Sequence, residues 1–276
     1  MKNNYCLYST IFPKSKKNFF DFIKSVNQQT EINFKLVLCL NGTSLNKKQL
    51  SAIKVPYSLV KCDLPMNKAR VYALKKILNF FSHIVLLDSD DYMSLDRIDL
   101  VKKNIKKNDF LVNNLYIFSN LKKKPKQWLN IRNNKKINLK DIKNQNFIGL
   151  SNFSVSTKAL KKIINKIDYN LVALDWCIAK LLLIYGYKGI YKKQIKTFYR
   201  QHDDNVSNLK NFSKKQIIND YKNKIENFQY FQKFGIHTTK EIEVLKSNYL
   251  KLKNQKKKYI SKFIKNKKKT SWWSHI

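Results

Sequence analysis

The sequence feature that most constrains the fold is a short apolar run that ends in a cluster of acids. His83-Ile84-Val85-Leu86-Leu87 is followed at once by Asp88-Ser89-Asp90-Asp91. A continuous apolar run of this length is typical of a strand buried on both faces of a parallel sheet. The run therefore predicts an α/β fold, with the acids at the carboxyl end of a buried strand, where open α/β sheets bind their ligands.

Strand and helix patterns alternate along the N-terminal part of the chain. Strands are expected at residues 5–12, 34–40 and 57–62, and helices at residues 18–28, 45–53 and 68–80. This order predicts βαβ units in an open sheet. Farther along, the pattern predicts an apolar helix at residues 173–185 and strands at residues 109–118, 147–155 and 187–199, with a Lys-rich insertion at residues 120–146.

The last part of the chain has a different pattern. From about residue 211 it reads as long, Lys-studded helices, so we predict a main domain of residues 1–208 and a helical C-terminal extension of residues 209–276. Within the extension, residues 256–273 combine an apolar helical face with a lysine face and end in two tryptophans. This composition fits a helix lying on anionic lipid, and it also fits a helix packed on the domain with its lysines in solvent.

The net charge of +38 first suggests an anionic partner. Only four of the 56 basic residues are arginines, however, and bidentate contacts to bases and phosphates favour arginine. Lys, Asn and Ile are also abundant in proteins from AT-rich genomes, because their codons are AT-rich and surface positions tolerate them. We therefore expect no nucleic-acid partner.

The cysteines and the first residues of the chain bear on the compartment. The four cysteines form no C-x-x-C pair and lie in or beside apolar runs, which indicates buried, reduced thiols. The start of the sequence lacks a signal-peptide pattern, and no run reaches the roughly 18 apolar residues of a membrane span. We expect a cytoplasmic protein, with peripheral contact at the inner face of the cytoplasmic membrane if residues 256–273 bind lipid.

The acidic cluster itself suggests metal chemistry. Three carboxylates within four residues repel one another unless a cation or hydrogen-bond donors lie among them. Mn²⁺ or Mg²⁺ would satisfy them, and a diphosphate would complete the metal's shell. Two alternatives share the pattern: a solvated acidic turn that caps a helix, and the Asp nucleophile of haloacid-dehalogenase-like phosphatases. In that phosphatase family, however, the strand normally lies near the N-terminus.

Three motifs in order resemble family 2 glycosyltransferases of the GT-A fold, over roughly residues 3–208. The first is Asn67-Lys68-Ala69-Arg70 on a helix that precedes the acidic strand end. The second is Leu174-Asp175-Trp176 at the start of the apolar helix, and the third is the segment from Tyr199-Arg200-Gln201-His202 to Ser207. The resemblance implies an open mixed sheet flanked by helices, with the helical extension outside the family's domain.

The resemblance also implies roles for individual residues. Asp175, which on its own reads as a helix cap, would be the catalytic base, and Asp90, Asp91 and His202 would bind the metal. The residues implied to contact the nucleotide-sugar donor are Thr10, Phe12, Asn41, Asp63, Lys68, Arg70, Asp88, Ser89, Asp90 and Arg200. Asn41 departs from the family, which usually carries Asp there. Residues 149–152 would line the acceptor side, or simply form a turn.

The activity implied is inverting transfer of a sugar from a nucleoside-diphosphate donor to a surface-glycan or lipid-linked acceptor, with Mn²⁺ or Mg²⁺ as cofactor. Two other functions remain open at this point. One is a non-enzymatic basic module that binds nucleic acid or membrane, for which the net charge is the argument. The other is a phosphatase that uses an Asp nucleophile.

Overall fold

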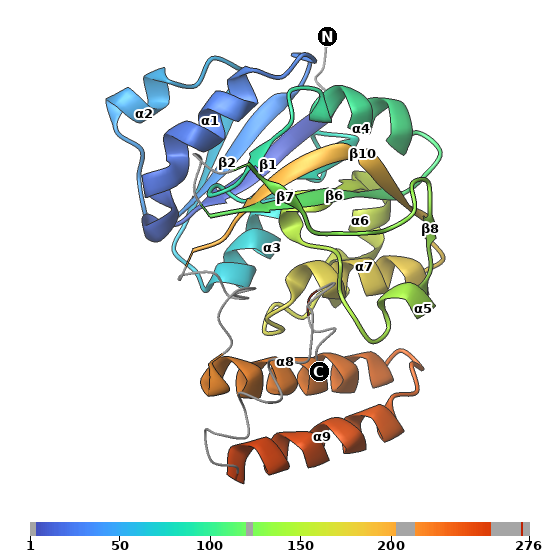
Figure 1. The fold of residues 1–276 in the computed structure, drawn as a ribbon. Helices are drawn as coiled ribbons and strands as arrows, with labels where there is room; N and C mark the ends of the chain where they lie inside the picture. Colours follow the sequence, from blue (N-terminus) through green and yellow to red (C-terminus); the bar gives the residue numbers. More distant parts are fainter. Residues whose placement is uncertain (1–3, 120–123, 203–212, 255–271, 273–276) are drawn as a thin grey trace.

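A computed structural model describes residues 4–119, 124–202, 213–254 and 272 of the 276-residue chain. Its centre is a mixed sheet with helices on both faces (Figure 1). Across the sheet the main path runs β3 (Tyr57–Cys62), β2 (Lys35–Asn41), β1 (Tyr5–Ile11), β4 (His83–Leu86), β9 (Phe153–Ser156), β6 (Phe110–Phe118), β10 (Gly189–Arg200) and β5 (Tyr92–Met93). The open α/β sheet predicted from the sequence is confirmed.

The first half of the sheet is parallel, as the alternating pattern predicted. β1 pairs in parallel with both β2 and β4, so that Leu7 lies beside Leu36 on one side and Val85 on the other. Ile84, Val85 and Leu86 are each at most 2% exposed. The acids that follow therefore begin at the carboxyl end of a strand buried on both faces.

Alternating side chains of β1 separate two hydrophobic cores. Leu7 packs in the core that contains α1 (Phe19–Asn27) and α4 (Arg97–Ile105). Cys6 and Tyr8 point to the other face, into the core that contains α3 (Met66–Ile77), α6 (Thr157–Ile163) and α7 (Leu174–Ile184). The molecule thus has helix, sheet and helix layers, with the short helix α2 (Lys47–Ser51) at its edge (Figure 1).

The second half of the sheet brings distant segments to the acidic cluster. β9 lies antiparallel between β4 and β6, and β10 runs parallel to β6. β5, directly after the acids, pairs antiparallel with the end of β10, where Phe198 lies opposite Tyr92. This pairing holds the residues after β10 beside Asp88 to Asp91.

The predicted strand at residues 147–155 is only partly correct. Residues 147–149 have no regular secondary structure, and a short 3₁₀ turn, η2 (Leu150–Asn152), leads into β9, so only residues 153–155 of the predicted range are strand. The Lys-rich insertion contains two short strands, β7 (Lys126–Gln127) and β8 (Lys136–Ile137), and one helical turn, α5 (Leu139–Ile142).

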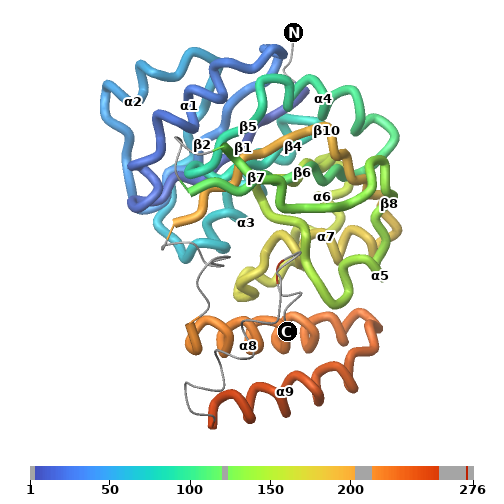
Figure 2. The backbone as a smooth tube through the Cα atoms, in the orientation of Figure 1, coloured from blue at the N-terminus to red at the C-terminus, as the bar shows by residue number. Residues whose placement is uncertain are grey.

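Residues 213–254, the main described part of the C-terminal extension, form α8 (Lys214–Gln232) and α9 (Thr239–Asn254), which run side by side below α7 (Figures 1 and 2). α8 packs against α7 by its apolar face, since the ring centroids of Phe228 on α8 and Trp176 on α7 are 6.2 Å apart. Lys180 Nζ is 3.6 Å from the ring centroid of Trp176 and 5.1 Å from that of Phe228, and it donates a 2.6 Å hydrogen bond to Asn227 Oδ1. Among the described helices, none is both long and apolar enough to cross a membrane.

Candidate active site

A cavity of about 550 Å³ lies at the carboxyl ends of β1 and β4. Its lining combines side chains from both halves of the sheet. Eight of the residues predicted for the site line it: Thr10, Phe12, Arg70, Asp88, Ser89, Asp90, Asp175 and His202. The sequence motifs therefore converge on one cavity.

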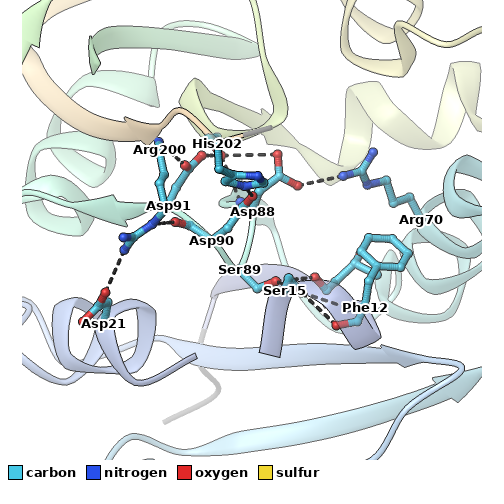
Figure 3. A network of polar contacts seen from close by, with 12 residues as sticks. Phe12, Ser15, Asp21, Arg70, Asp88, Ser89, Asp90, Asp91, Arg200 and His202 are labelled. Carbon is cyan, nitrogen blue, oxygen red and sulfur yellow. Dashed lines mark hydrogen bonds and ion pairs between the residues drawn. The ribbon is translucent and has the colours of Figure 1, made fainter. Parts of the chain in front are cut away.

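Asp88 faces the cavity, where an arginine from α3 binds it. Arg70 Nη2 donates a 2.8 Å hydrogen bond to Asp88 Oδ1, and the backbone N–H of Asp88 donates to Ser151 Oγ at 3.0 Å (Figure 3). Burial raises the pKa of Asp88 above its ordinary value, and the Arg70 guanidinium opposes that shift. The pair gives one wall a carboxylate and a cation side by side.

Ser89 fastens the acidic loop to the N-terminal strand. Its hydroxyl donates to the backbone oxygen of Thr10 at 2.9 Å and lies 2.8 Å from Ser15 Oγ (Figure 3). Ser15 in turn accepts from the backbone N–H of Phe12 at 3.0 Å. Two of the residues predicted to contact the donor are thus held in place by the same loop that carries the acids.

Asp91 lies beneath the cavity and does not line it. The side chain is 1% exposed, and both carboxylate oxygens accept hydrogen bonds, one from the backbone N–H of Arg200 at 2.7 Å and the other from Ser151 Oγ. Burial, with Asp90 and Asp88 close by, raises the pKa of Asp91 well above its ordinary value. The metal role predicted for Asp91 does not fit this geometry, in which the side chain fastens β10 to the loop.

Arg200 also differs from its predicted donor role. Its guanidinium extends away from Asp88 toward α1, where Nη2 donates to Asp21 Oδ2 at 2.8 Å, and its Nε donates to the backbone oxygen of Asp90 at 2.7 Å (Figure 3). The guanidinium carbon lies 4.7 Å from the ring centroid of Phe118. Arg200 therefore cross-links the acidic loop to α1 and does not line the cavity.

His202 and Asp90 form the pair best placed to bind a cation. His202 Nε2 lies 2.8 Å from Asp90 Oδ2, and both side chains line the cavity. They remain partly open, with side-chain exposures of 22% and 21%. A carboxylate oxygen and an imidazole nitrogen are ligands that Mn²⁺ accepts.

Asn41, Asp63 and Lys68 lie beside the cavity, outside its lining. Asn41 accepts from the backbone N–H of Leu64 at 2.9 Å and donates to the backbone oxygen of the same residue at 2.9 Å, so it fixes the loop after β3. Asp63 lies against Gly42, whose φ of +59° is in the left-handed region that favours glycine. Lys68 is exposed, with its Nζ 5.8 Å from the ring centroid of Tyr169. Their predicted donor contacts stay predictions.

Asp175 is in the first turn of α7 and faces the cavity. It is not the helix cap, because that position belongs to Ala173. Its Oδ1 accepts from the backbone N–H of Trp176 at 2.6 Å and from Asn146 Nδ2 at 3.1 Å. Burial raises the pKa of Asp175 to about 7, against the opposing effect of these two hydrogen bonds. The side chain is thus a carboxyl group that titrates near neutral pH, as a general base requires.

Three further residues of the site, Asn146, Ser151 and Trp272, were not among the catalytic, donor and metal residues predicted from the sequence. Asn146 lies in the Asn- and Lys-rich insertion, where nothing distinguishes it from its neighbours. Ser151 bonds both Asp88 and Asp91, and lies in the segment that the family resemblance placed on the acceptor side. Trp272, in the segment whose composition fits either a helix on lipid or a helix packed on the domain, lines the cavity and is 7% exposed. The rest of that segment lies outside the described residues.

The similarity of this chain to known proteins lies in its three-dimensional structure. No protein-family model matches the sequence, and no curated protein matches it. The fold resembles residues 1–349 of TarS from S. aureus, with a TM-score of 0.59 and 14% identity over 82% of this chain and 65% of that chain. It also resembles the mannosyltransferase PcManGT from Pyrobaculum calidifontis in complex with GDP-Man and Mn²⁺, with a TM-score of 0.56 and 10% identity over 82% and 63% of the two chains.

A third similar structure is GalNAc-T7 with UDP, GalNAc and Mn²⁺, with a TM-score of 0.55 and 11% identity over 89% of this chain and 54% of that one. The chain thus spans less than two thirds of the length of these structures. At such identities a shared fold is what the comparison establishes. The chain has the GT-A fold of nucleotide-sugar glycosyltransferases, as the order of its motifs predicted.

Proposed function

We propose that this protein is an inverting, family 2-like glycosyltransferase that moves a sugar from a nucleoside-diphosphate donor to an acceptor hydroxyl. The observation that carries the proposal is a single cavity that holds both the Asp90 and His202 pair and the buried carboxyl group of Asp175. Similar structures hold UDP, UDP-GlcNAc or GDP-Man, which supports a nucleotide-sugar donor.

Asp90 and His202 would hold the divalent cation, Mn²⁺ or Mg²⁺. Within the described part of the chain no three His, Cys, Asp or Glu side chains are grouped as a metal site, so diphosphate oxygens and water would supply the remaining ligands. The cation would supply charge neutralisation to the departing diphosphate. The open edge of the pair, at the cavity wall, fits that role.

Asp175 would take the proton from the acceptor. As the acceptor oxygen bonds to the anomeric carbon, the bond from that carbon to the diphosphate breaks, and the acceptor's proton moves to the carboxylate. Attack from the side opposite the leaving group inverts the anomeric configuration. The pKa of about 7 makes the Asp175 carboxylate a stronger base than an exposed aspartate, while a sizeable fraction stays ionised at neutral pH.

The Arg70 and Asp88 pair would position the donor. Arg70 brings a guanidinium to the cavity, with its central carbon 5.6 Å from the ring centroid of Phe12. A cation beside an aromatic ring suits a nucleotide, whose phosphates and base need both contacts. Asp88, fixed by Arg70, would accept hydrogen bonds from donor hydroxyls.

The deciding experiment is thermal-shift titration with UDP and GDP, each with and without Mn²⁺. One nucleotide should stabilise the protein only when metal is present, and at about 100 times its Kd the gain is about 2.7 kcal/mol. Asp90→Asn should lose this gain. Asp99→Asn is the matched control, because Asp99 lies on α4, outside the cavity lining, where it pairs with Lys103.

The two alternative functions predict other results. A basic nucleic-acid or membrane module would bind heparin or anionic vesicles in a salt-sensitive way, with no effect of Asp90→Asn. An Asp-nucleophile phosphatase would release phosphate from sugar phosphates, although the GT-A fold gives that reading no support. Either result, with no metal-dependent nucleotide binding, would refute the glycosyltransferase proposal.

The acceptor class and location stay proposals as well. A surface-glycan or lipid-linked acceptor would suit an enzyme at the inner face of the cytoplasmic membrane. Trp272 cannot serve as a lipid anchor while it is buried in the cavity wall, so membrane contact would depend on the other residues of 256–273. Sedimentation with anionic vesicles tests this directly.

A further inference from the structure

A residue from the far C-terminal part of the chain completes the wall beside Asp175. Trp272 forms a two-way backbone bridge with Asn146: its N–H donates at 2.7 Å, and its carbonyl accepts at 3.0 Å. The indole makes edge contacts with Trp128 at 4.5 Å and Tyr199 at 5.8 Å between ring centroids. Trp272 and Tyr199 both line the cavity.

The neighbouring glycine leaves space for this ring. A Cβ atom on Gly149 would lie 2.7 Å from Trp272 Cη2, closer than real Cβ contacts. The backbone of Gly149 has φ −110° and ψ 163°, a conformation open to any residue. Glycine is therefore needed at residue 149 because a side chain there would clash with the Trp272 indole. The backbone conformation does not require glycine.

The same bridge reaches the proposed base. Asn146, whose backbone pairs with Trp272, donates its side-chain N–H to Asp175 Oδ1 at 3.1 Å and to the backbone oxygen of Ile148 at 2.8 Å. Asn146 is 2% exposed, so this arrangement is fixed. The aromatic wall and the carboxyl group are thus positioned by one residue.

We propose that Trp272, with Tyr199, forms the acceptor subsite and binds a pyranose ring of the acceptor. The inference rests on the proposed glycosyltransferase function. A pyranose presents an apolar C–H face that packs on an aromatic wall, and hydroxyls at its edge that reach polar groups. Here the wall adjoins Asp175, the group that would deprotonate the attacking hydroxyl. A hydrocarbon tail would offer no hydroxyl group to that carboxyl group.

The test uses the full chain with Trp272→Ala, Trp272→Phe and Gly149→Ala. The bridge to Asn146 is made by backbone groups, so Trp272→Ala removes the ring and leaves the bridge's donors and acceptors in place. Gly149→Ala displaces the ring, and the double variant Gly149→Ala/Trp272→Ala removes that clash. Phe80→Ala is the control, because Phe80 is 73% exposed.

Two readouts separate this inference from the function on which it rests. The protein is tested with UDP-GlcNAc and GDP-mannose in the presence of Mn²⁺. Stabilisation of the protein by the nucleotide and slow hydrolysis of the donor by water measure the function of the donor part of the site. Transfer to a panel of p-nitrophenyl glycosides reports the acceptor half. Absence of both nucleotide stabilisation and donor hydrolysis in the wild type would refute the glycosyltransferase function itself.

We expect Trp272→Ala to raise the acceptor KM about tenfold or more, the equivalent of about 1.4 kcal/mol, with donor KM and hydrolysis within about twofold. Trp272→Phe should recover part of the loss. Gly149→Ala should resemble Trp272→Ala, and the double variant should be no worse than Trp272→Ala alone. Three results would each overturn the inference. The first is an unchanged acceptor KM in Trp272→Ala, and the second is faster transfer by that variant, which would show that the ring blocks the subsite. The third is a wild-type enzyme that hydrolyses the donor but transfers sugar to no glycoside.

Discussion

Replacement of Asp175 by asparagine isolates the proton-accepting role of this side chain. Asp175 Oδ1 accepts hydrogen bonds from the backbone N–H of Trp176 and from Asn146 Nδ2, and an amide oxygen can accept both. The shape and the hydrogen bonds of the site therefore survive the change. What is lost is the group that receives the acceptor's proton.

The size of the effect follows from the role. General-base catalysis contributes about 10²- to 10⁴-fold, so kcat for transfer should fall by that factor, or about 2.7–5.5 kcal/mol in activation free energy. Wild-type kcat should rise with pH up to about 7, where Asp175 loses its proton, and then level off. The residual kcat of Asp175→Asn should not show this rise with pH.

The variant should also change stability in a set direction. Since burial raises the folded pKa of Asp175 from 3.8 to about 7, the folded state holds a proton that the unfolded state releases across this range. The free energy of unfolding of the wild type should therefore fall, relative to Asp175→Asn, as the pH rises from about 4 to 7. Thermal unfolding of the two proteins at several pH values measures this difference.

The assay follows nucleoside-diphosphate release with the best donor and acceptor, beside thermal-shift measurement of nucleotide binding. Asp175→Asn should bind the nucleotide and Mn²⁺ as the wild type does. Asp99→Asn, on α4 and outside the cavity lining, is the control. Transfer at the wild-type rate by Asp175→Asn, or a loss of nucleotide binding that accounts for its whole defect, would show that the side chain is not the base.

Three more predictions concern residues around the base and the metal pair. Asn146→Ala removes a hydrogen bond that lowers the pKa of Asp175, so the pH limb of kcat should shift to higher pH; a shift to lower pH would contradict the reasoning. Arg200→Met cuts the link between the acidic loop and Asp21, so it should lower Tm by several degrees, and an unchanged Tm would show that the link contributes little. EDTA should abolish nucleotide stabilisation and added Mn²⁺ restore it; stabilisation that survives EDTA would argue against a metal at Asp90 and His202.

The sequence was most informative where backbone pattern and chemistry coincide. Ile84 to Leu87 predicted a doubly buried strand because such a strand has no polar face, and that strand placed Asp88, Ser89 and Asp90 correctly at the cavity. Asp175 was found through its resemblance to a family motif, since its local pattern alone suggested a helix cap.

Where a residue makes contacts that the sequence did not predict, long-range geometry is the reason. Asp91 and Asp90 are neighbours in the chain, yet Asp91 is buried against Ser151 and the backbone of Arg200, whereas Asp90 lines the cavity. The family resemblance implied that Arg200 contacts the donor, and the carboxylate that it binds in the structure is Asp21, 179 residues away. Trp272 illustrates the same limit, because its role depends on a backbone pairing with Asn146 that no local pattern encodes.

The packing of α8 has a consequence for any shortened form of the protein. Ile217, Tyr221, Phe228 and Phe231 on this helix are each 1% exposed, and they belong to the same core as Trp176, the neighbour of Asp175. A chain that ended near residue 208 would lack α8 and would expose the apolar surface around Trp176 that α8 covers, and surfaces of that kind associate with one another. Such a chain should be recovered as aggregates, and its lack of activity would carry no information about catalysis.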